Sequence, residues 1–280
     1  MKVCLKLDHH LRKMFMSSRT YRAVYSCESL RSVSYRLNGC RDLTLVFDPD
    51  ADPDPYTAVV TDESSMSLLK MDSFVITDGR INGLISLKDF SEDAPCLLTD
   101  RSAPDPSGTL TLESALRKST REGMCSVFSH DDPLGNRLRT MLGALSSVNP
   151  VEPAFIPLLY HFAGLGPGST PAGDDFICGV LSALKLYPGP WRNPPYSTLS
   201  LYRGFRKLTC RRSAGYLLSV LLGRLTPKQR SILATSAGKT CPNLENTLHT
   251  GHTSGADFAF GVWFTARSCL NGWCPWNTLN

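Results

Sequence analysis

The stretch GLGPGSTPAGDDFICG, residues 164–179, joins a glycine-rich loop to the start of an apolar run. Glycine is used where a backbone must bend or approach another group closely, and adjacent carboxylates at a bend rarely serve packing. Thr170 is a candidate N-cap and Pro171 suits the first helical position, which places Asp174 and Asp175 in the first turn of a helix. Carboxylates there face the positive end of the helix dipole, an arrangement that also stabilises a helix without any ligand.

A second stretch, GHTSGADFAFG at residues 251–261, repeats this pattern. The run Gly-Asp-Asp-Phe-x-x-Gly at 173–179 matches Gly-Ala-Asp-Phe-x-x-Gly at 255–261. Asp175 and Asp257 are therefore equivalent and lie 82 residues apart (257 − 175). Each stretch opens a helix with N–H groups, hydroxyls and a carboxylate, and two such helix starts can converge on one small ligand. We predict a binding site that both segments build together.

The candidate site residues all come from these two stretches. The candidate catalytic residues are the acids and the histidine: Asp174, Asp175, Asp257 and His252. The candidate substrate-binding residues are the glycines and hydroxyl residues: Gly164, Gly166, Gly168, Ser169, Thr170, Gly173, Gly251, Thr253, Ser254 and Gly255. Three aspartates repel phosphate unless an arginine or Mg²⁺ stands between them, so the ligand should combine an anionic group with N–H or O–H donors, or bring a cation. His252 fits both a proton donor and an ordinary polar contact.

The periodicity of apolar residues changes along the chain. Between residues 22 and 90, short runs rich in β-branched and aromatic residues predict strands, and FVITDGRINGLISL (74–87) predicts a hairpin that turns at Asp78 and Gly79. The other strands are expected at RAVYSC (22–27), SVSYRL (32–37), DLTLVFD (42–48) and TAVVTD (57–62). From about residue 110 onward, apolar residues recur three and four apart, as on the buried faces of helices. The helices are expected within 110–123, 136–148, 152–164, 170–187, 213–225, 227–238 and 255–269.

These patterns predict an α+β fold with two domains. Residues 1–105 should form a β-rich N-terminal domain, either a small barrel-like or a swivelling sheet. Residues 106–280 should form an α-helical domain that carries both glycine-rich stretches. A chain of 280 residues is long enough for two such cores.

Composition indicates a cytoplasmic protein with reduced cysteines. The basic N-terminus has no apolar segment of the secretory type, no apolar run is long enough to span a membrane, and the ten cysteines are spread evenly. The net charge of +5 is too small to indicate a nucleic-acid partner. The densest basic patch, YRGFRKLTCRR at 202–212, fits a solvated helix face or a linker, with anion binding and a partner surface as alternatives.

The two glycine-rich stretches, with Thr209 and Ser213 between them, resemble a bacterial domain family of unknown-function origin that contains the AllH-type subunit of oxamate carbamoyltransferase. The resemblance covers roughly residues 20–268, and Ser169 stands where the family more often has leucine. It implies carbamoyl transfer between carbamoyl phosphate and oxamate, giving oxalurate and phosphate, as in purine and allantoin degradation. It also implies partner subunits in a carbamoyltransferase assembly.

Three functions stay open on these residues. In the first, a transferase subunit without a cofactor, backbone amides stabilise developing negative charge while Asp175 and Asp257 orient N–H donors of a small anionic substrate. In the second, Asp174, Asp175 and Asp257 bind Mg²⁺ in a hydrolase or phosphotransferase. The third is a non-catalytic subunit that completes a site on another chain. A homo-oligomer is compatible with all three, and we expect no membrane partner.

Overall fold

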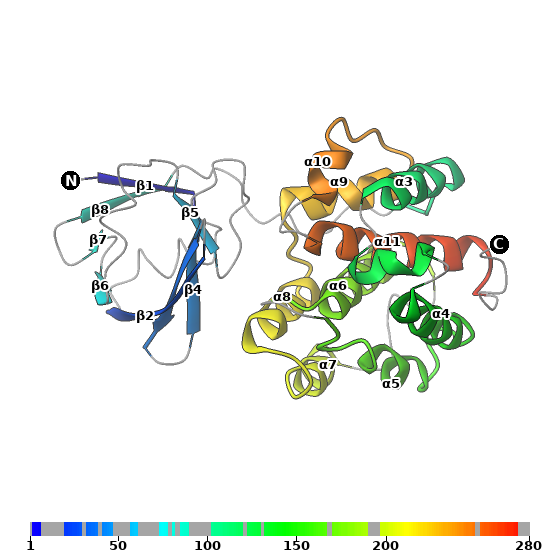
Figure 1. The fold of residues 1–280 in the computed structure, drawn as a ribbon, viewed down its shortest axis with the longest axis horizontal. Helices are drawn as coiled ribbons and strands as arrows, with labels where there is room; N and C mark the ends of the chain where they lie inside the picture. The colour runs from blue at the N-terminus through cyan, green and yellow to red at the C-terminus, as the bar shows by residue number, and fades with distance from the viewer. Residues whose placement is uncertain are drawn as a thin grey trace. The chain divides into compact units, whose positions relative to one another are not determined.

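The computed structural model describes residues 2–6, 20–29, 32–38, 41–46, 57–60, 73–77, 80–81, 85–89, 102–119, 122–129, 132–166, 170–189, 197–249 and 253–273. The chain divides into two compact units, Met1–Cys96 and Leu97–Asn280 (Figure 1). The described elements of the first unit are strands and those of the second are helices, which confirms the α+β class. The domain boundary expected after residue 105 stays a prediction, because residues 90–101 lie outside the described parts.

The first unit is built from short strands. They are β1 (Lys2–Lys6), β2 (Tyr21–Ser29), β3 (Ser32–Leu37), β4 (Arg41–Val46), β5 (Thr57–Val60), β6 (Ser73–Thr77), β7 (Arg80–Ile81) and β8 (Ile85–Asp89). They pair in the order β1-β5-β4-β3-β2-β6-β7-β8, and β8 pairs back with β1, so the order closes on itself (Figure 1). The finer expectation of a barrel-like or a swivelling sheet stays a prediction, since most connections between these strands lie outside the described residues.

Alternation of side chains explains why β3 and β4 pair as they do. Tyr35 and Leu37 are buried on β3, Leu43 and Leu45 are buried on β4, and Tyr35 lies opposite Leu43. Alternate residues of a strand point to one face, so these four side chains cover the same side of the antiparallel pair.

The predicted hairpin is present as the antiparallel pair of β6 and β7, in which Thr77 lies opposite Arg80. Its expected turn residues, Asp78 and Gly79, lie outside the described residues. Strand β1 was not predicted from the sequence.

The second unit is helical. Its elements are α3 (Pro106–Ser119), the 3-10 helix η2 (Gly123–Phe128), α4 (Pro133–Ser146), α5 (Phe155–Tyr160), α6 (Ala172–Leu186), α7 (Thr198–Phe205), α8 (Arg211–Leu221), α9 (Pro227–Ser236), α10 (Leu244–Leu248) and α11 (Ser254–Leu270). Each of the seven predicted ranges overlaps one of these helices, and α3, α4, α8 and α11 begin one to four residues before the predicted range. Sequence periodicity missed η2, α7 and α10, which have only six, eight and five residues. Such short segments hold too few turns to show a period.

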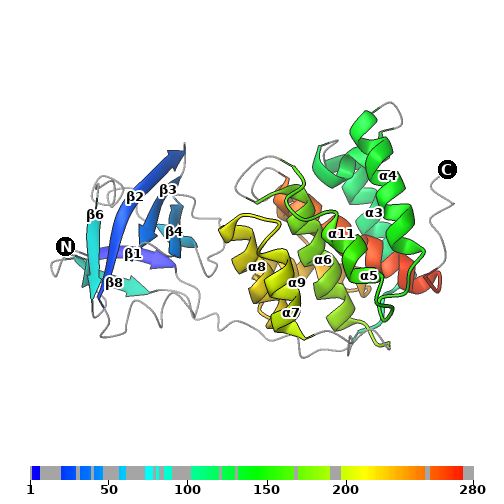
Figure 2. The same ribbon diagram turned by 90° about the horizontal axis from the view of Figure 1, so that it is seen from below.

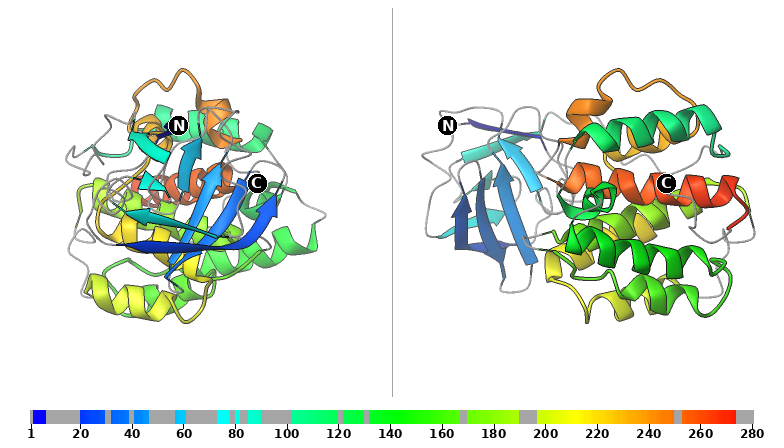
Figure 3. Two further views of the ribbon diagram at one scale, coloured as in Figure 1. Left: turned by 90° about the vertical axis from the view of Figure 1, so that its left-hand side faces the viewer. Right: turned by 45° about the vertical axis from the view of Figure 1, so that its right-hand side comes forward.

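Helix α11 is the central element of this unit. Nearly every residue from Ala256 to Ala266 is buried, and the helix packs against α6, α3, α9, α10 and η2. Figure 3 (right) shows α11 running alongside α3, with α6 on its other side. A helix that is apolar on all sides must be enclosed by other elements, which is what its sequence provides.

The crossing of α6 and α11 depends on two glycines, Gly179 and Gly261. Their Cα atoms are so close that a Cβ on either one would lie 3.0 Å from the other. A Cβ at Gly179 would also overlap the carbonyl oxygen of Phe258, and one at Gly261 would overlap that of Phe176. Both pairs are related by the 82-residue offset of the repeated motif (261 − 179 and 258 − 176). The two copies of the motif therefore cross each other with approximate two-fold symmetry.

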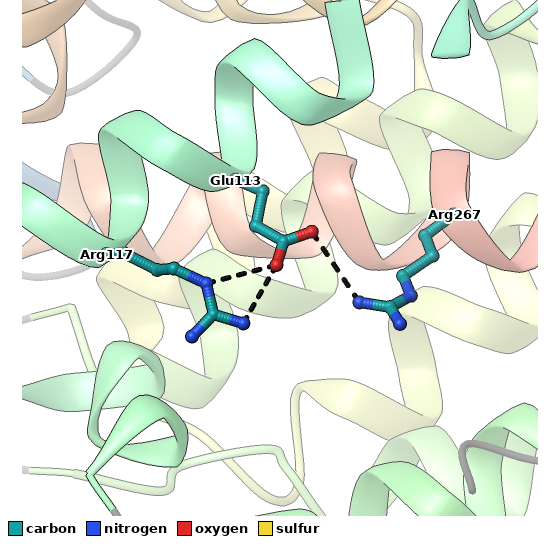
Figure 4. A network of polar contacts seen from close by, with 3 residues as sticks. All are labelled: Glu113, Arg117 and Arg267. Carbon is teal, nitrogen blue, oxygen red and sulfur yellow. Dashed lines mark hydrogen bonds and ion pairs between the residues drawn. The ribbon is translucent and has the colours of Figure 1, made fainter. Parts of the chain in front are cut away.

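An ion-pair network joins α3 to α11 (Figure 4). Glu113 Oε1 accepts hydrogen bonds from Arg117 Nε at 3.0 Å and Nη2 at 2.8 Å, and its Oε2 lies 3.6 Å from Arg267 Nη1. The Arg117 guanidinium also lies 4.4 Å from the ring centre of Phe128 in η2. This network links α3 to the central helix α11 and to η2.

Two expectations from composition concern thiols and membranes. Five cysteines of the helical unit are free thiols, of which Cys125 and Cys178 are buried; the others are Cys210, Cys241 and Cys269. Among the described residues, no helix combines the length and the apolar character that a membrane crossing requires.

Replacing Gly261 by alanine should destabilise the helical unit by about 1–3 kcal/mol, because the new methyl group would overlap the Phe176 backbone at the helix crossing. Gly143→Ala is the matched control. Gly143 lies inside α4 with open space where its Cβ would stand, so this change should stabilise by roughly 0.5–1 kcal/mol. Urea unfolding of both variants and the wild type measures the difference. A Gly261→Ala protein as stable as the wild type would contradict the close crossing.

Candidate functional site

The two glycine-rich stretches meet at their helix starts. Thr170 Oγ1 lies 3.0 Å from Ser254 Oγ, although the residues are 84 positions apart in the chain. The expectation that Thr170 caps α6 is wrong: Pro171 occupies the N-cap position and the helix begins at Ala172. The threonine hydroxyl contacts Ser254 at the start of α11.

The Asp174 carboxylate holds the first glycine-rich stretch in place through hydrogen bonds. The residue is buried, with 1% of its surface exposed. Its Oδ1 accepts a hydrogen bond from the Gly164 N–H at 2.8 Å, and its Oδ2 accepts one from the Thr209 hydroxyl. Gly164 has a φ of +72° and packs against the carbonyl oxygen of Leu208, so a side chain there would be both strained and obstructed. Asp174 thus ties the loop before α6 to the segment before α8.

The Asp257 carboxylate makes a similar contact, in this case with η2. It is fully buried, and its Oδ1 accepts a hydrogen bond from the Met124 N–H at 2.7 Å. Gly123, the first residue of η2, has a φ of +57°, and a Cβ there would overlap the Asp257 carboxylate. Sequence reasoning missed Gly123 and Met124 because a single glycine after a charged segment gives no signal of a partner 133 residues away.

Asp175 is more exposed than Asp174 and Asp257. The residue is half-buried, yet its Oδ2 atom is enclosed and has no hydrogen-bond partner among the described residues. Burial raises the pKa of Asp175 well above its ordinary value of 3.8, a hydrogen bond with Ser254 lowers this pKa, and the charge of Asp257 raises it. Asp175 and Asp257 are therefore close enough to interact, as the repeated motif predicts.

Two further charges act on Asp175. The neighbouring Asp174 also raises the pKa of Asp175 and Arg212 of α8 lowers it, both with less effect than burial. Cys178, one turn further along α6, is buried beside these acids, and burial followed by the charges of Asp175 and Asp174 raises the pKa of its thiol. The surroundings of Asp175 thus favour its protonated form.

Several predicted binding glycines have packing contacts. A Cβ at Gly173 would overlap the carbonyl oxygen of Phe162, and the Gly173 N–H donates to Leu165 O at 2.9 Å. A Cβ at Gly255 would lie 2.8 Å from the carbonyl oxygen of Leu248. These contacts account for both glycines by packing alone, so their contacts with substrate stay predictions.

Gly166 and Thr253 are two further candidates that lie within the described residues. Gly166 has a φ of +106°, a conformation that glycine adopts most readily, and Thr253 is the N-cap residue of α11. The other candidates lie outside the described residues: Gly168, Ser169, Gly251 and His252. The predicted roles of these residues stay predictions.

The described residues contain no group of three His, Cys, Asp or Glu side chains that could hold a metal ion. The expected absence of a cofactor stays a prediction. A separate open groove of about 690 Å³ lies between α3 and residues 241–246, and none of the candidate site residues line it. The candidate site is therefore defined by the meeting of α6 and α11.

This part of the chain has a match among known families. Residues 162–266 match the family model of oxamate carbamoyltransferase subunit AllH. The AllH-matching segment, as we call these residues, contains α6 to α10 and most of α11, and the resemblance seen in the sequence is confirmed over it. Gly123 and Met124, which contact Asp257, lie outside this segment. A comparison with solved structures finds no significant match for the chain.

The raised pKa of Asp175 predicts how stability depends on pH. The folded protein keeps a proton on Asp175 that the unfolded chain releases near its ordinary pKa of 3.8. The free energy of unfolding should therefore fall as pH rises from about 4 through the folded-state pKa. Asp175→Asn, which cannot ionise, should remove this part of the fall, whereas Glu245→Gln on the exposed side of α10 should keep it. Urea unfolding at several pH values tests this, and parallel curves for wild type and Asp175→Asn would contradict it.

Proposed function

We propose that this chain is a subunit of a carbamoyltransferase-type enzyme and that the junction of α6 and α11 binds its small anionic substrate. The candidate ligands are carbamoyl phosphate and an oxamate- or oxalurate-like compound. The observation that carries the proposal is the contact of Thr170 with Ser254 beside Asp175, inside the AllH-matching segment.

The chemistry of carbamoyl transfer explains why such a junction is suitable. The amide nitrogen of oxamate attacks the carbonyl carbon of carbamoyl phosphate, a C–N bond forms, and the C–O bond to phosphate breaks. Negative charge develops on the carbonyl oxygen, and the attacking nitrogen must lose a proton. Helix N-termini stabilise developing negative charge, and a carboxyl group with a raised pKa suits proton transfer near neutral pH.

The three aspartates then have different roles. Asp174 and Asp257 accept hydrogen bonds from Gly164, Thr209 and Met124, and we assign them to holding the two helix starts. Asp175 keeps some exposed surface and we assign it to the substrate, as acceptor of an amide N–H or of its proton. This differs from the sequence-based expectation, in which Asp175 and Asp257 orient the substrate as an equivalent pair.

The magnesium alternative is less well supported. A cation held by three aspartates needs their oxygens as ligands. Both oxygens of Asp174 and Oδ1 of Asp257 already accept hydrogen bonds from the protein. The third function, a non-catalytic subunit, would use the same binding site without the proton transfer.

Ser254→Ala should weaken binding of oxamate and carbamoyl phosphate by about 10–100-fold, since hydrogen bonds to charged groups contribute about 1.5–3 kcal/mol. Isothermal titration calorimetry measures the change at fixed pH and salt concentration. Ser114→Ala, on an exposed position of α3, is the control and should bind as the wild type does. Equal affinity of the Ser254→Ala and Ser114→Ala proteins would contradict the location of the site.

Catalysis and binding can be separated by adding partner subunits. Carbamoyl transfer should be measured with this chain alone and with the other subunits of the assembly, for wild type and Asp175→Asn. We expect Asp175→Asn to lower the rate of the complete assembly at least tenfold while its substrate still binds. An unchanged rate with Asp175→Asn would favour the non-catalytic subunit.

A further inference from the structure

Helix α8 starts at the same end of the unit as α6. Next to the start of α6, Asp174 accepts a hydrogen bond from Thr209, two residues before α8 begins. Near the other end of α6, Lys185 Nζ donates to the carbonyl oxygens of Val220 and Leu221, at the end of α8. These two contacts show that α6 and α8 run side by side in the same direction (Figure 2). The N-termini of α6, α8 and α11 therefore all lie near Asp174 and Asp175.

The N-terminal cap of α8 is weak. Its N-cap residue is Cys210, and the Cys210 Sγ accepts a hydrogen bond from the Ser213 N–H with an N···S distance of 3.5 Å. Sulfur is a weaker hydrogen-bond acceptor than the oxygens of the residues that usually cap helices. The first amides of α8 therefore gain little from their cap, and an oxygen acceptor would bind them better.

Ser213, in the first turn of α8, carries a second and independent indication of a ligand. The residue is 1% exposed, and its Oγ has no hydrogen-bond partner among the described residues. A buried hydroxyl without a partner costs free energy, and it commonly marks a position where a ligand or a water molecule completes the hydrogen bonding. Asp175 Oδ2, across the helix pair, is enclosed without a partner in the same way.

Charge points to the kind of ligand. Arg212, between the cap and Ser213, is half-buried and acts electrostatically on Asp175. Asp174, Asp175 and Asp257 would repel an anion from the start of α6 or α11 unless a cation lay near. A guanidinium group binds phosphate or carboxylate through two parallel hydrogen bonds, which a helix N-terminus reinforces.

We propose that the start of α8, through Arg212, Ser213 and its first amides, binds the phosphate or carboxylate group of the substrate. The inference rests on the proposed function, because the amide-bearing part of the same ligand would lie against α6 and α11. The site then separates the two halves of its ligand: α8 contacts the anionic half, and Asp175 with Ser254 contacts the half that carries N–H groups. The basic patch at 202–212 accordingly includes an anion-binding residue.

The test uses three probes that need no carbamoyl chemistry: inorganic phosphate, oxalate and the neutral diamide oxamide. Calorimetry at low ionic strength compares wild type with Arg212→Gln, Arg212→Lys and Arg211→Gln. The last is the matched control, because Arg211 is the exposed neighbour on the same helix turn. Arg212→Gln should weaken phosphate and oxalate binding at least tenfold and change oxamide binding less than twofold. Arg212→Lys should fall between, since lysine keeps the charge but not the paired hydrogen bonds.

Each outcome decides one of the two proposals. Equal loss of phosphate binding in Arg212→Gln and Arg211→Gln would overturn the inference and indicate a general effect of net charge. Phosphate and oxalate binding that survives in Arg212→Gln would also overturn it, while leaving substrate binding at α6 and α11 intact. If the wild type binds neither anion, the anion site does not exist, and carbamoyl transfer by the complete assembly then decides the proposed function alone. A thermal melt of each variant detects loss of folding. Ser213→Ala is a second test variant, which should weaken phosphate binding without a change in net charge.

Discussion

The close crossing of α6 and α11 fixes the positions of the groups that these two helices contribute to the candidate site. Gly179 and Gly261 allow the two backbones to touch, and this contact brings Thr170 within 3.0 Å of Ser254. A larger residue at either glycine would push the helices apart by the width of a methyl group. Asp175 would then lose its interaction with the start of α11, because both helix starts are held only a few turns from the crossing.

Collecting three acids in one place requires compensation, and the chain supplies it by hydrogen bonds and by burial of a proton. Asp174 and Asp257 are buried and accept hydrogen bonds from Gly164, Thr209 and Met124. Burial favours the protonated form of Asp175, because its effect on the pKa is larger than that of the hydrogen bond with Ser254. The residue also keeps some exposed surface, which leaves it available for a substrate. This matches the common relation between a perturbed pKa and a functional group.

The sequence was sufficient to predict the fold class, seven of the helices and the meeting of the two glycine-rich stretches. These features follow from periodicity and from a repeated motif, which are local properties. Neither property reveals which residue accepts a hydrogen bond from which: Thr209 is 35 positions from Asp174, and Met124 is 133 from Asp257. The start of α6 was misplaced by one residue because Thr170 contacts a second chain segment that local capping rules cannot include.

The two copies of the motif are alike where their helices cross, but different chain segments surround their helix starts. This difference makes the two sides of the site unequal. At the crossing, the copies are equivalent, since each glycine packs against the carbonyl oxygen of a phenylalanine in the other helix. At the helix starts the copies differ: η2 donates the Met124 N–H to the fully buried Asp257, whereas Asp175 has a hydrogen bond with Ser254 of α11 and keeps some exposed surface. A symmetric pair of helix starts would offer two equal carboxylates. Asp257 is enclosed against η2, which lies outside the AllH-matching segment, so Asp175 is the partly exposed acid of the pair, near Arg212 and Ser254. A ligand with one anionic end and one amide end can then bind in only one orientation.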